Sequence, residues 1–165
     1  MEILNFKDFV SESISRPIIK KTAGVAVIFN NQILLVHPTN SGWRRPTCGI
    51  PKGGVEPMED LKDAAVRELL EETGIRINPS QLKLSPEVVD FYAKSGEVRG
   101  QLTYYVLEIR DLSEIGLETL KLPKSMLQVE EIDWAKFVSP EDAYPIMSMP
   151  QRIILDRHLK MTTKL

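Results

Sequence analysis

The stretch PKGGVEPMEDLKDAAVRELLEETGI, Pro51–Ile75, contains the pattern that decides how this sequence is interpreted. Seven carboxylates stand between Glu56 and Glu72, and Lys62 and Arg67 are the basic residues among them. Runs of charge in proteins usually form a solvated face, so an exposed acidic surface is the simplest interpretation. The spacing of the last glutamates favours a more specific one.

A helix of about four turns is expected over 59–73, and Gly74 is its natural C-terminal stop. At about 100° per residue, Glu68, Glu71 and Glu72 fall within one narrow arc of that helix. The same side carries apolar residues one or two turns earlier, namely Leu61, Ala64 and Ala65. The glutamates therefore continue a face that leans towards the protein interior.

Three glutamates so close together repel one another, by roughly 0.2–0.5 kcal/mol for each like-charged pair even in water. Burial raises that cost unless a cation compensates it. Clustered carboxylate oxygens are the ligands that hard divalent cations such as Mg²⁺ and Mn²⁺ prefer. The spacing therefore indicates a metal site, with the solvated acidic face as the alternative.

The pattern resembles the Nudix (MutT-like) hydrolase signature, G-x5-E-x7-R-E-U-x-E-E-x-G-U, in which U is a bulky aliphatic residue. Every specified position is matched, by Gly53, Glu59, Arg67, Glu68, Leu69, Glu71, Glu72, Gly74 and Ile75. Chance agreement is remote, because each fixed residue has a probability of roughly one in ten to twenty. The resemblance implies the Nudix fold, an α/β/α sandwich with a mixed β-sheet between helices.

Nudix hydrolases use Mg²⁺ or Mn²⁺ to cleave the diphosphate of nucleoside diphosphates that are linked to another group. By this resemblance Glu68, Glu71 and Glu72 are the expected metal ligands, and Gly53 lets the backbone approach the metal. Arg67 is expected to hold the Glu71 carboxylate, and both are counted among the catalytic residues. The expected activity is therefore that of a divalent-metal-dependent pyrophosphohydrolase.

Other candidates lie at the edge of the signature or beyond it. Glu59 stands at the expected helix start, where the helix dipole favours a carboxylate, so its role is structural or ligating. The catalytic base varies within the family. In QVEEIDWAKFVSPEDA, which is similar to the late family segment, Glu131 is preferred over Glu130. Lys52 is a candidate phosphate contact, with an ordinary surface lysine as the alternative.

The run PKGGVEPMED is similar to that of the asymmetrical dinucleoside tetraphosphate hydrolases. Tyr92 follows the signature at the distance at which members acting on dinucleoside polyphosphates carry a tyrosine, and its ring is expected to stack on adenine. Arg44 and Arg45 are further candidates for substrate contacts. Cys48 marks a departure, because many members carry W-x-x-P just before the glycines of the signature.

A dinucleoside polyphosphate is thus the expected substrate. ADP-ribose and other nucleoside diphosphate sugars are the main alternatives, followed by RNA 5′ ends and inositol pyrophosphates. A Nudix-fold ligand sensor without catalysis is the alternative of another class. His37, His158 and Cys48 form no readable nucleophile arrangement, and the absence of a G-x-x-x-x-G-K-[ST] loop argues against a P-loop NTPase.

The chain of 165 residues is 42% hydrophobic and 27% charged, which suits one domain over 1–165. A net charge of −2 does not indicate a nucleic-acid binder or a membrane-surface protein. The resemblance implies a small nucleotide as the partner, with RNA 5′ ends as the one nucleic-acid possibility. The N-terminus MEILNFKDFVSES lacks the apolar region of a secretory signal, and the apolar run 23–29 is too short to span a bilayer. These features and the single cysteine predict a cytoplasmic protein without membrane association.

The expected elements outside the signature alternate between strands and helices. A short helix is expected over 5–12, and strands over 22–29 and 32–37 form a hairpin. Prolines and glycines predict an irregular loop over 38–58. Further strands are expected at 88–92, 102–109 and 132–138, and helices from Ser139 and over 151–160.

Overall fold

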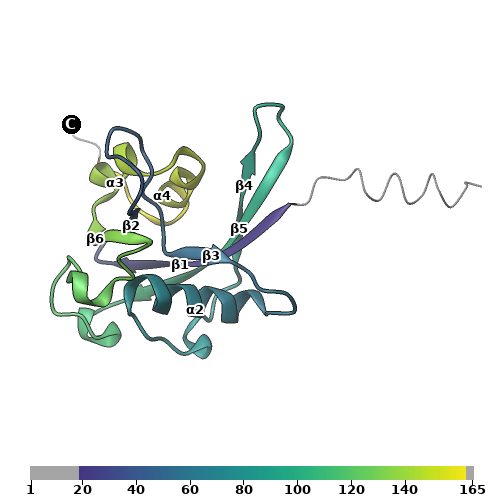
Figure 1. Cartoon of the computed structure of the whole chain (residues 1–165). Helices are drawn as coiled ribbons and strands as arrows, with labels where there is room; N and C mark the ends of the chain where they lie inside the picture. The colour runs from purple at the N-terminus through teal and green to yellow at the C-terminus, as the bar shows by residue number, and fades with distance from the viewer. Residues whose placement is uncertain (1–18, 163–165) are drawn as a thin grey trace, which may run out of the picture.

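The structure is a computed structural model that describes residues 19–162, so the helix expected over 5–12 lies outside the described residues. Its centre is a six-stranded mixed sheet in the order β4-β5-β1-β2-β6, with β3 paired to β1 (Figure 1). The strands are β1 Lys20–Phe29, β2 Gln32–Pro38, β3 Lys52–Gly54, β4 Glu87–Tyr92, β5 Val98–Ile109 and β6 Ile132–Val138. The α-helices of the described part are α2 Leu61–Thr73, α3 Pro140–Ile146 and α4 Ile153–His158.

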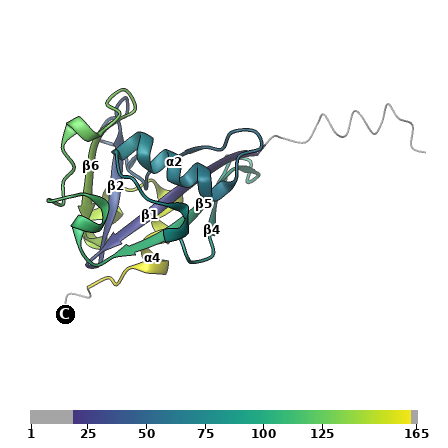
Figure 2. The same ribbon diagram turned by 90° about the horizontal axis from the view of Figure 1, so that it is seen from below.

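Helices cover both faces of the sheet. Helix α2 lies on one face of the sheet, and α3 and α4 lie on the other (Figure 1). Figure 2 shows the molecule from the side of α2. The core beneath α2 includes Ala64, Ala65 and Leu69 of that helix. The core on the opposite face includes Ala143, Ile154 and Leu155. This arrangement confirms the predicted α/β/α sandwich with a mixed sheet.

The expected hairpin of β1 and β2 forms at Asn30 and Asn31, whose φ angles of 49° and 56° suit a two-residue turn. Away from the turn the two strands separate, and the chain around β3 enters the space between them. There Val36 bridges Gly49, and β3 pairs with β1. The expectation of an irregular loop over 38–58 was therefore wrong for 52–54, because β1 supplies a partner for a segment with little strand propensity of its own.

Helix α2 is the expected signature helix, and its ends have clear causes. It begins at Leu61 rather than near Glu59, because the Asp60 carboxylate caps it by accepting the N–H of Lys62 at 2.9 Å. It ends at Gly74, as expected, where a φ of 72° gives the left-handed C-cap.

The C-terminal layer also follows the expectation in part. Helix α3 begins with Ser139 as N-cap and Pro140 at the first helical position. The single helix expected over 151–160 is instead a 3₁₀ turn, Met149–Arg152, followed by α4. A tight first turn of this kind is common at helix N-termini. Within residues 19–162, no helix has the length and apolar character needed to cross a bilayer.

Candidate active site

The three glutamates of α2 differ in burial although they share one side of the helix. Glu68 and Glu72 are each 8% exposed, whereas Glu71 has 48% of its side chain exposed. The two buried residues are one helical turn apart and face the segment that contains β3. The predicted cluster therefore consists of two buried carboxylates and one at the solvent rim.

Strand β3 brings its backbone directly against these carboxylates. The N–H of Lys52 donates a hydrogen bond to Oε2 of Glu72 at 3.2 Å. A Cβ atom built on Gly53 would lie only 2.2 Å from the carboxylate of Glu68, whereas one on Gly54 would meet nothing within 4 Å. Gly53 is therefore required for the close approach of β3 to Glu68, and Gly54 is not.

A Gly53→Ala substitution should displace the Glu68 carboxylate and leave the fold intact, because the atoms that must move are the end of a flexible side chain. We expect kcat to fall roughly 10- to 100-fold, the effect of a misplacement of about 1 Å in an active site. Gly54→Ala is the matched control and should retain the parent rate. Equal rates for the two variants, at unchanged Tm, would contradict the role given to Gly53.

The buried carboxylates carry negative charge that the protein compensates only in part. Burial raises the pKa of Glu72 to about 8, and the charges of Glu68 and Glu131 add to this rise. Burial also raises the pKa of Glu68, against the hydrogen bond from Arg67. The pKa of the Lys52 ammonium is lowered by burial, although Glu72 and Glu68 oppose that shift. A bound cation would stabilise the ionised form of both carboxylates.

Arg67 connects the helix to the loop that follows β3. Its Nε and Nη2 atoms each donate to the Glu59 carboxylate at 2.8 Å, and Nη2 also donates to the carbonyl of Gly54 at 2.9 Å. Nη1 donates to Glu68 at 2.9 Å and to Glu71 at 3.2 Å. The contact with Glu71 is present, but the two-pronged pair with Glu59 is shorter and was not expected.

Glu59 has a different setting from the one expected at a helix start. It lies before the N-cap, and its carboxylate also accepts the backbone N–H of Glu56 at 3.0 Å. The hydrogen bond from Arg67 is the main cause that lowers its pKa to about 2. Of the two roles expected for Glu59, structural or ligating, this geometry favours the structural one, because Glu59 holds the loop while Arg67 orients the carboxylates.

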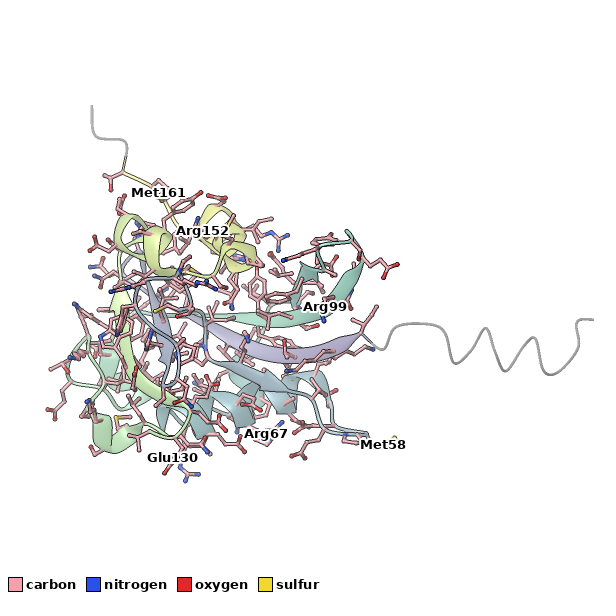
Figure 3. The ribbon with its side chains drawn as sticks, turned by 45° about the horizontal axis from the view of Figure 1, so that its top comes forward. Met58, Arg67, Arg99, Glu130, Arg152 and Met161 are labelled. Carbon is pink, nitrogen blue, oxygen red and sulfur yellow. The ribbon has the colours of Figure 1, made fainter. Side chains whose placement is uncertain are left out.

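Glu131 lies close to the buried glutamates although it is far away in the sequence. It lines a cavity of about 330 Å³ together with Lys52 and Glu72. Its charge contributes to the raised pKa of both Glu68 and Glu72. Glu130 does not line this cavity and lies at the edge of the molecule (Figure 3). Of the two candidates for the base, Glu131 is therefore the one that lines the cavity with Glu72.

The structure does not bring the other predicted substrate contacts into this cavity. Tyr92 is 64% exposed at the end of β4, whereas its neighbour Phe91 lines the cavity. The pairing of β4 with β5 is irregular between these two residues, and of the two rings only Phe91 lines the cavity. Arg44 and Arg45 are exposed on the loop after β2 and do not line the cavity either.

Sequence reasoning missed Phe91 and Gln151 among the residues of the cavity. Gln151 is buried, and its Oε1 accepts the N–H of Ile50 at 2.9 Å, which connects the C-terminal layer to the segment before β3. The signal available for Phe91 was its position as a second aromatic residue next to Tyr92. The sequence contained no comparable signal for Gln151, because its partner is about 100 residues away.

The histidines and the cysteine do not form a nucleophilic site. His37 pairs with Asp133 at 2.6 Å, and His158 contacts Glu87 at the other end of the molecule. Cys48 is a buried free cysteine whose pKa is raised to about 12 by burial and by the charge of Asp133. A thiol in this state is not a nucleophile near neutral pH.

The residues at this site have the chemistry to bind a divalent cation, although their side chains are not already gathered into a full set of ligands. Within residues 19–162, no three carboxylate, histidine or cysteine side chains converge closely enough to hold an ion. The donors are nevertheless oxygen atoms only, and Glu68 and Glu72 are buried with raised pKa values. Oxygen donors with uncompensated negative charge suit Mg²⁺ or Mn²⁺. Glu71 and the backbone at Gly53 would complete such a set.

Comparison with known proteins places these features in a family. The NUDIX domain model matches residues 19–158. The chain is 41% identical over 76 residues to the m7GpppN-mRNA hydrolase NUDT17 of Danio rerio, covering 44% of this chain and 24% of that protein. It is 39% identical over 86 residues to the RNA pyrophosphohydrolase of Dinoroseobacter shibae, covering 45% and 53%. The chain thus spans about half or less of the length of these curated relatives.

A solved structure supports the fold. The Ap4A hydrolase of C. elegans, determined as a binary complex, superposes with a TM-score of 0.60 at 22% identity, covering 84% of this chain and 94% of that one. The family match spans nearly all of the described residues and includes the complete signature from Gly53 to Ile75. The chain therefore belongs to the NUDIX domain family.

Proposed function

We propose that this protein is a divalent-metal-dependent pyrophosphohydrolase that cleaves a diphosphate linkage in a nucleoside diphosphate derivative. The observation that carries the proposal is the concentration of charge at one cavity. Glu72, Glu131 and Lys52 line this cavity, and the second buried glutamate, Glu68, lies about one helical turn from Glu72 on α2. Cations are needed to stabilise so many acids close together, and a diphosphate brings further negative charge.

Each residue has a separate part in the proposed reaction. Glu68, Glu71, Glu72 and the backbone at Gly53 would hold the cation, which neutralises phosphate oxygens and lowers the pKa of bound water. The oxygen of a water molecule bonds to phosphorus, the anhydride P–O bond breaks, and the proton of the water passes to Glu131.

The supporting residues bind and orient rather than react. Lys52 would meet the charge of the phosphates, and its location in the same cavity as Glu72 and Glu131 supports this role. Arg67 fixes the orientation of the Glu68 and Glu71 carboxylates through its hydrogen bonds. We also propose that the chain forms one domain over 1–165 and that the protein is cytoplasmic.

We further propose a substrate with a nucleoside at each end of a phosphate chain, and a dinucleoside polyphosphate is the best-supported example. The PKGGVEPMED run supports it. Ap4A, in the name of a structural neighbour, is a molecule of this type, and m7GpppN-mRNA, in the name of a relative, is an RNA whose 5′ end carries a second nucleoside through a phosphate chain. The RNA pyrophosphohydrolase relative supports RNA 5′ ends as the second candidate. ADP-ribose and a non-catalytic sensor remain alternatives.

Steady-state kinetics with Mg²⁺ or Mn²⁺ test the substrate. We expect kcat/KM for diadenosine tetraphosphate to exceed that for ADP-ribose and for RNA carrying a 5′-triphosphate. A preference for ADP-ribose would remove the reason for choosing two-nucleoside substrates. Binding of these compounds without turnover, under conditions in which the cation is bound, would support the sensor instead.

A pair of alanine variants separates the two rings of β4. Phe91→Ala should lower kcat/KM for diadenosine tetraphosphate roughly 5- to 100-fold, the effect of losing one stacked base. Tyr92→Ala is the matched control from the adjacent position. If it lowers kcat/KM more than Phe91→Ala does, the stacking role belongs to Tyr92, as predicted from the sequence. Tm should be measured for both, because Phe91 also packs against the core.

A further inference from the structure

A second and larger cavity, of about 760 Å³, lies beside the proposed active site. Trp43, Asp133 and Trp134 form one side of it, and residues of the segment 116–127 form the other. Neither tryptophan has a part in the mechanism proposed above. The cavity is large enough to accept a nucleoside, since ligand pockets generally measure about 300–1,000 Å³.

Trp43 has the features of a rigid stacking platform. One face of its ring stacks on His37, with centroids 3.9 Å apart and planes only 4° from parallel. His37 is 1% exposed and is held by Asp133 at 2.6 Å. Trp134 meets Trp43 edge to face with centroids 5.4 Å apart. Trp43 nevertheless remains 55% exposed and lines the cavity, so its ring is held against His37 while part of its surface stays accessible.

Some residues that line the first cavity are close in the sequence to residues that line the second. Glu131 lines the first cavity and Asp133 the second, so their Cα atoms are at most about 7 Å apart. Pro38, at the start of the loop that carries Trp43, also lines the first cavity. Arg44 and Arg45 follow Trp43 on that loop and are exposed. A phosphate chain bound near Glu131 would therefore need to extend only a short way to reach the loop of Trp43, which also carries these two cations.

We propose that Trp43 stacks on the distal nucleobase of a substrate with two nucleosides, whose diphosphate lies beside Glu72 and Glu131. This inference rests on the proposed function and adds a site for the second nucleoside. Every nucleobase presents a flat π-face, so stacking on tryptophan stabilises the complex without requiring one particular base. The site also accounts for a large aromatic residue that is exposed at the surface yet fixed underneath.

Kinetics with substrates that differ in one nucleoside test the site. Trp43→Ala should lower kcat/KM for diadenosine tetraphosphate roughly 5- to 100-fold. The value for adenosine 5′-tetraphosphate, which has a single base, should change less than about twofold. Trp43→Phe should recover most of the loss, and Leu84→Ala removes an equally exposed residue outside both cavities as a control. Equal losses on both substrates would show instead that Trp43 supports the fold through His37.

A binding measurement keeps the inference separate from catalysis. Trp43 and Trp134 are the two tryptophans of the chain, so Trp134→Phe leaves Trp43 as the one indole fluorophore. With Glu131→Gln added to slow turnover, and with Mg²⁺ present, diadenosine tetraphosphate should quench the emission to saturation. Adenosine 5′-tetraphosphate should quench it much less. Quenching in a protein that hydrolyses no nucleotide would support this site while refuting the proposed function, and equal quenching by both compounds, or none, would refute the site.

Discussion

Replacing Glu72 with glutamine is expected to lower kcat by roughly 10²- to 10³-fold or more while leaving the fold intact. The substitution keeps the shape of the side chain and removes the charge that would hold the cation. Glu72 is 8% exposed and accepts a backbone hydrogen bond from Lys52, so glutamine can occupy the same space. Initial rates at saturating Mg²⁺ or Mn²⁺ measure the effect, and EDTA should abolish the activity of the parent.

Glu56→Gln is the matched control, because Glu56 is an exposed acid of the same signature segment. It should retain the parent rate. Full activity of the parent in EDTA, or an unimpaired Glu72→Gln protein, would refute the metal site.

The Glu72→Gln variant should also differ from the parent in the pH dependence of its stability, which can be measured without an activity assay. The folded-state pKa of Glu72, about 8, lies above its ordinary value of 4.5, so the folded protein keeps a proton that the unfolded chain releases. Stability therefore decreases as pH rises from about 4.5 to about 8. Glutamine has no proton to lose, so in EDTA the Tm of Glu72→Gln relative to the parent should increase with pH. A constant Tm difference over this range would contradict the buried, uncompensated carboxylate.

Replacing Glu131 with glutamine is expected to lower kcat by roughly 10²–10⁴-fold, with little change in KM. Glu131 lines the cavity with Lys52 and Glu72, where a water molecule beside the substrate can reach it. Glutamine keeps the size of the side chain but cannot accept the proton. Pre-steady-state and steady-state rates should both fall if proton transfer limits the reaction.

The adjacent Glu130 provides the control, because it is an acid of the same loop outside the cavity. Glu130→Gln should change kcat by less than about threefold. An effect of Glu131→Gln below threefold would instead move the base into the α2 helix, with Glu71 as the exposed candidate.

Local rules account for what was predictable in this fold. Helical spacing placed Glu68, Glu71 and Glu72 on one side of α2, and the left-handed preference of glycine predicted the end at Gly74. The spacing did not reveal that Glu71 would remain at the surface, because burial depends on the neighbouring segment. Strand β3 was also missed, since two of its three residues are glycines and its pairing with β1 is a tertiary contact.

The contacts that assemble the site are less accessible to sequence reasoning. Arg67 reaches back along α2 to Glu59, which lies just before the N-cap of the helix, a pairing that helical periodicity does not describe. Gln151 reaches Ile50 from the other end of the chain. Such contacts depend on how layers of the fold meet, and only the structure supplies that information. The sequence identified the residues whose chemistry suits the site, but it did not identify all of their hydrogen-bond partners.

The buried thiol of Cys48 makes local opening of the site measurable. It is the single cysteine, and a pKa near 12 keeps it protonated and unreactive while the segment around it is closed. A thiol reagent therefore modifies the native protein only during transient openings, at a rate proportional to the open fraction. Cys48 lies shortly before β3, next to the residues that Gln151 holds. The labelling rate thus yields a free energy of opening for the backbone that carries Gly53, and a ligand that holds β3 against α2 should slow it.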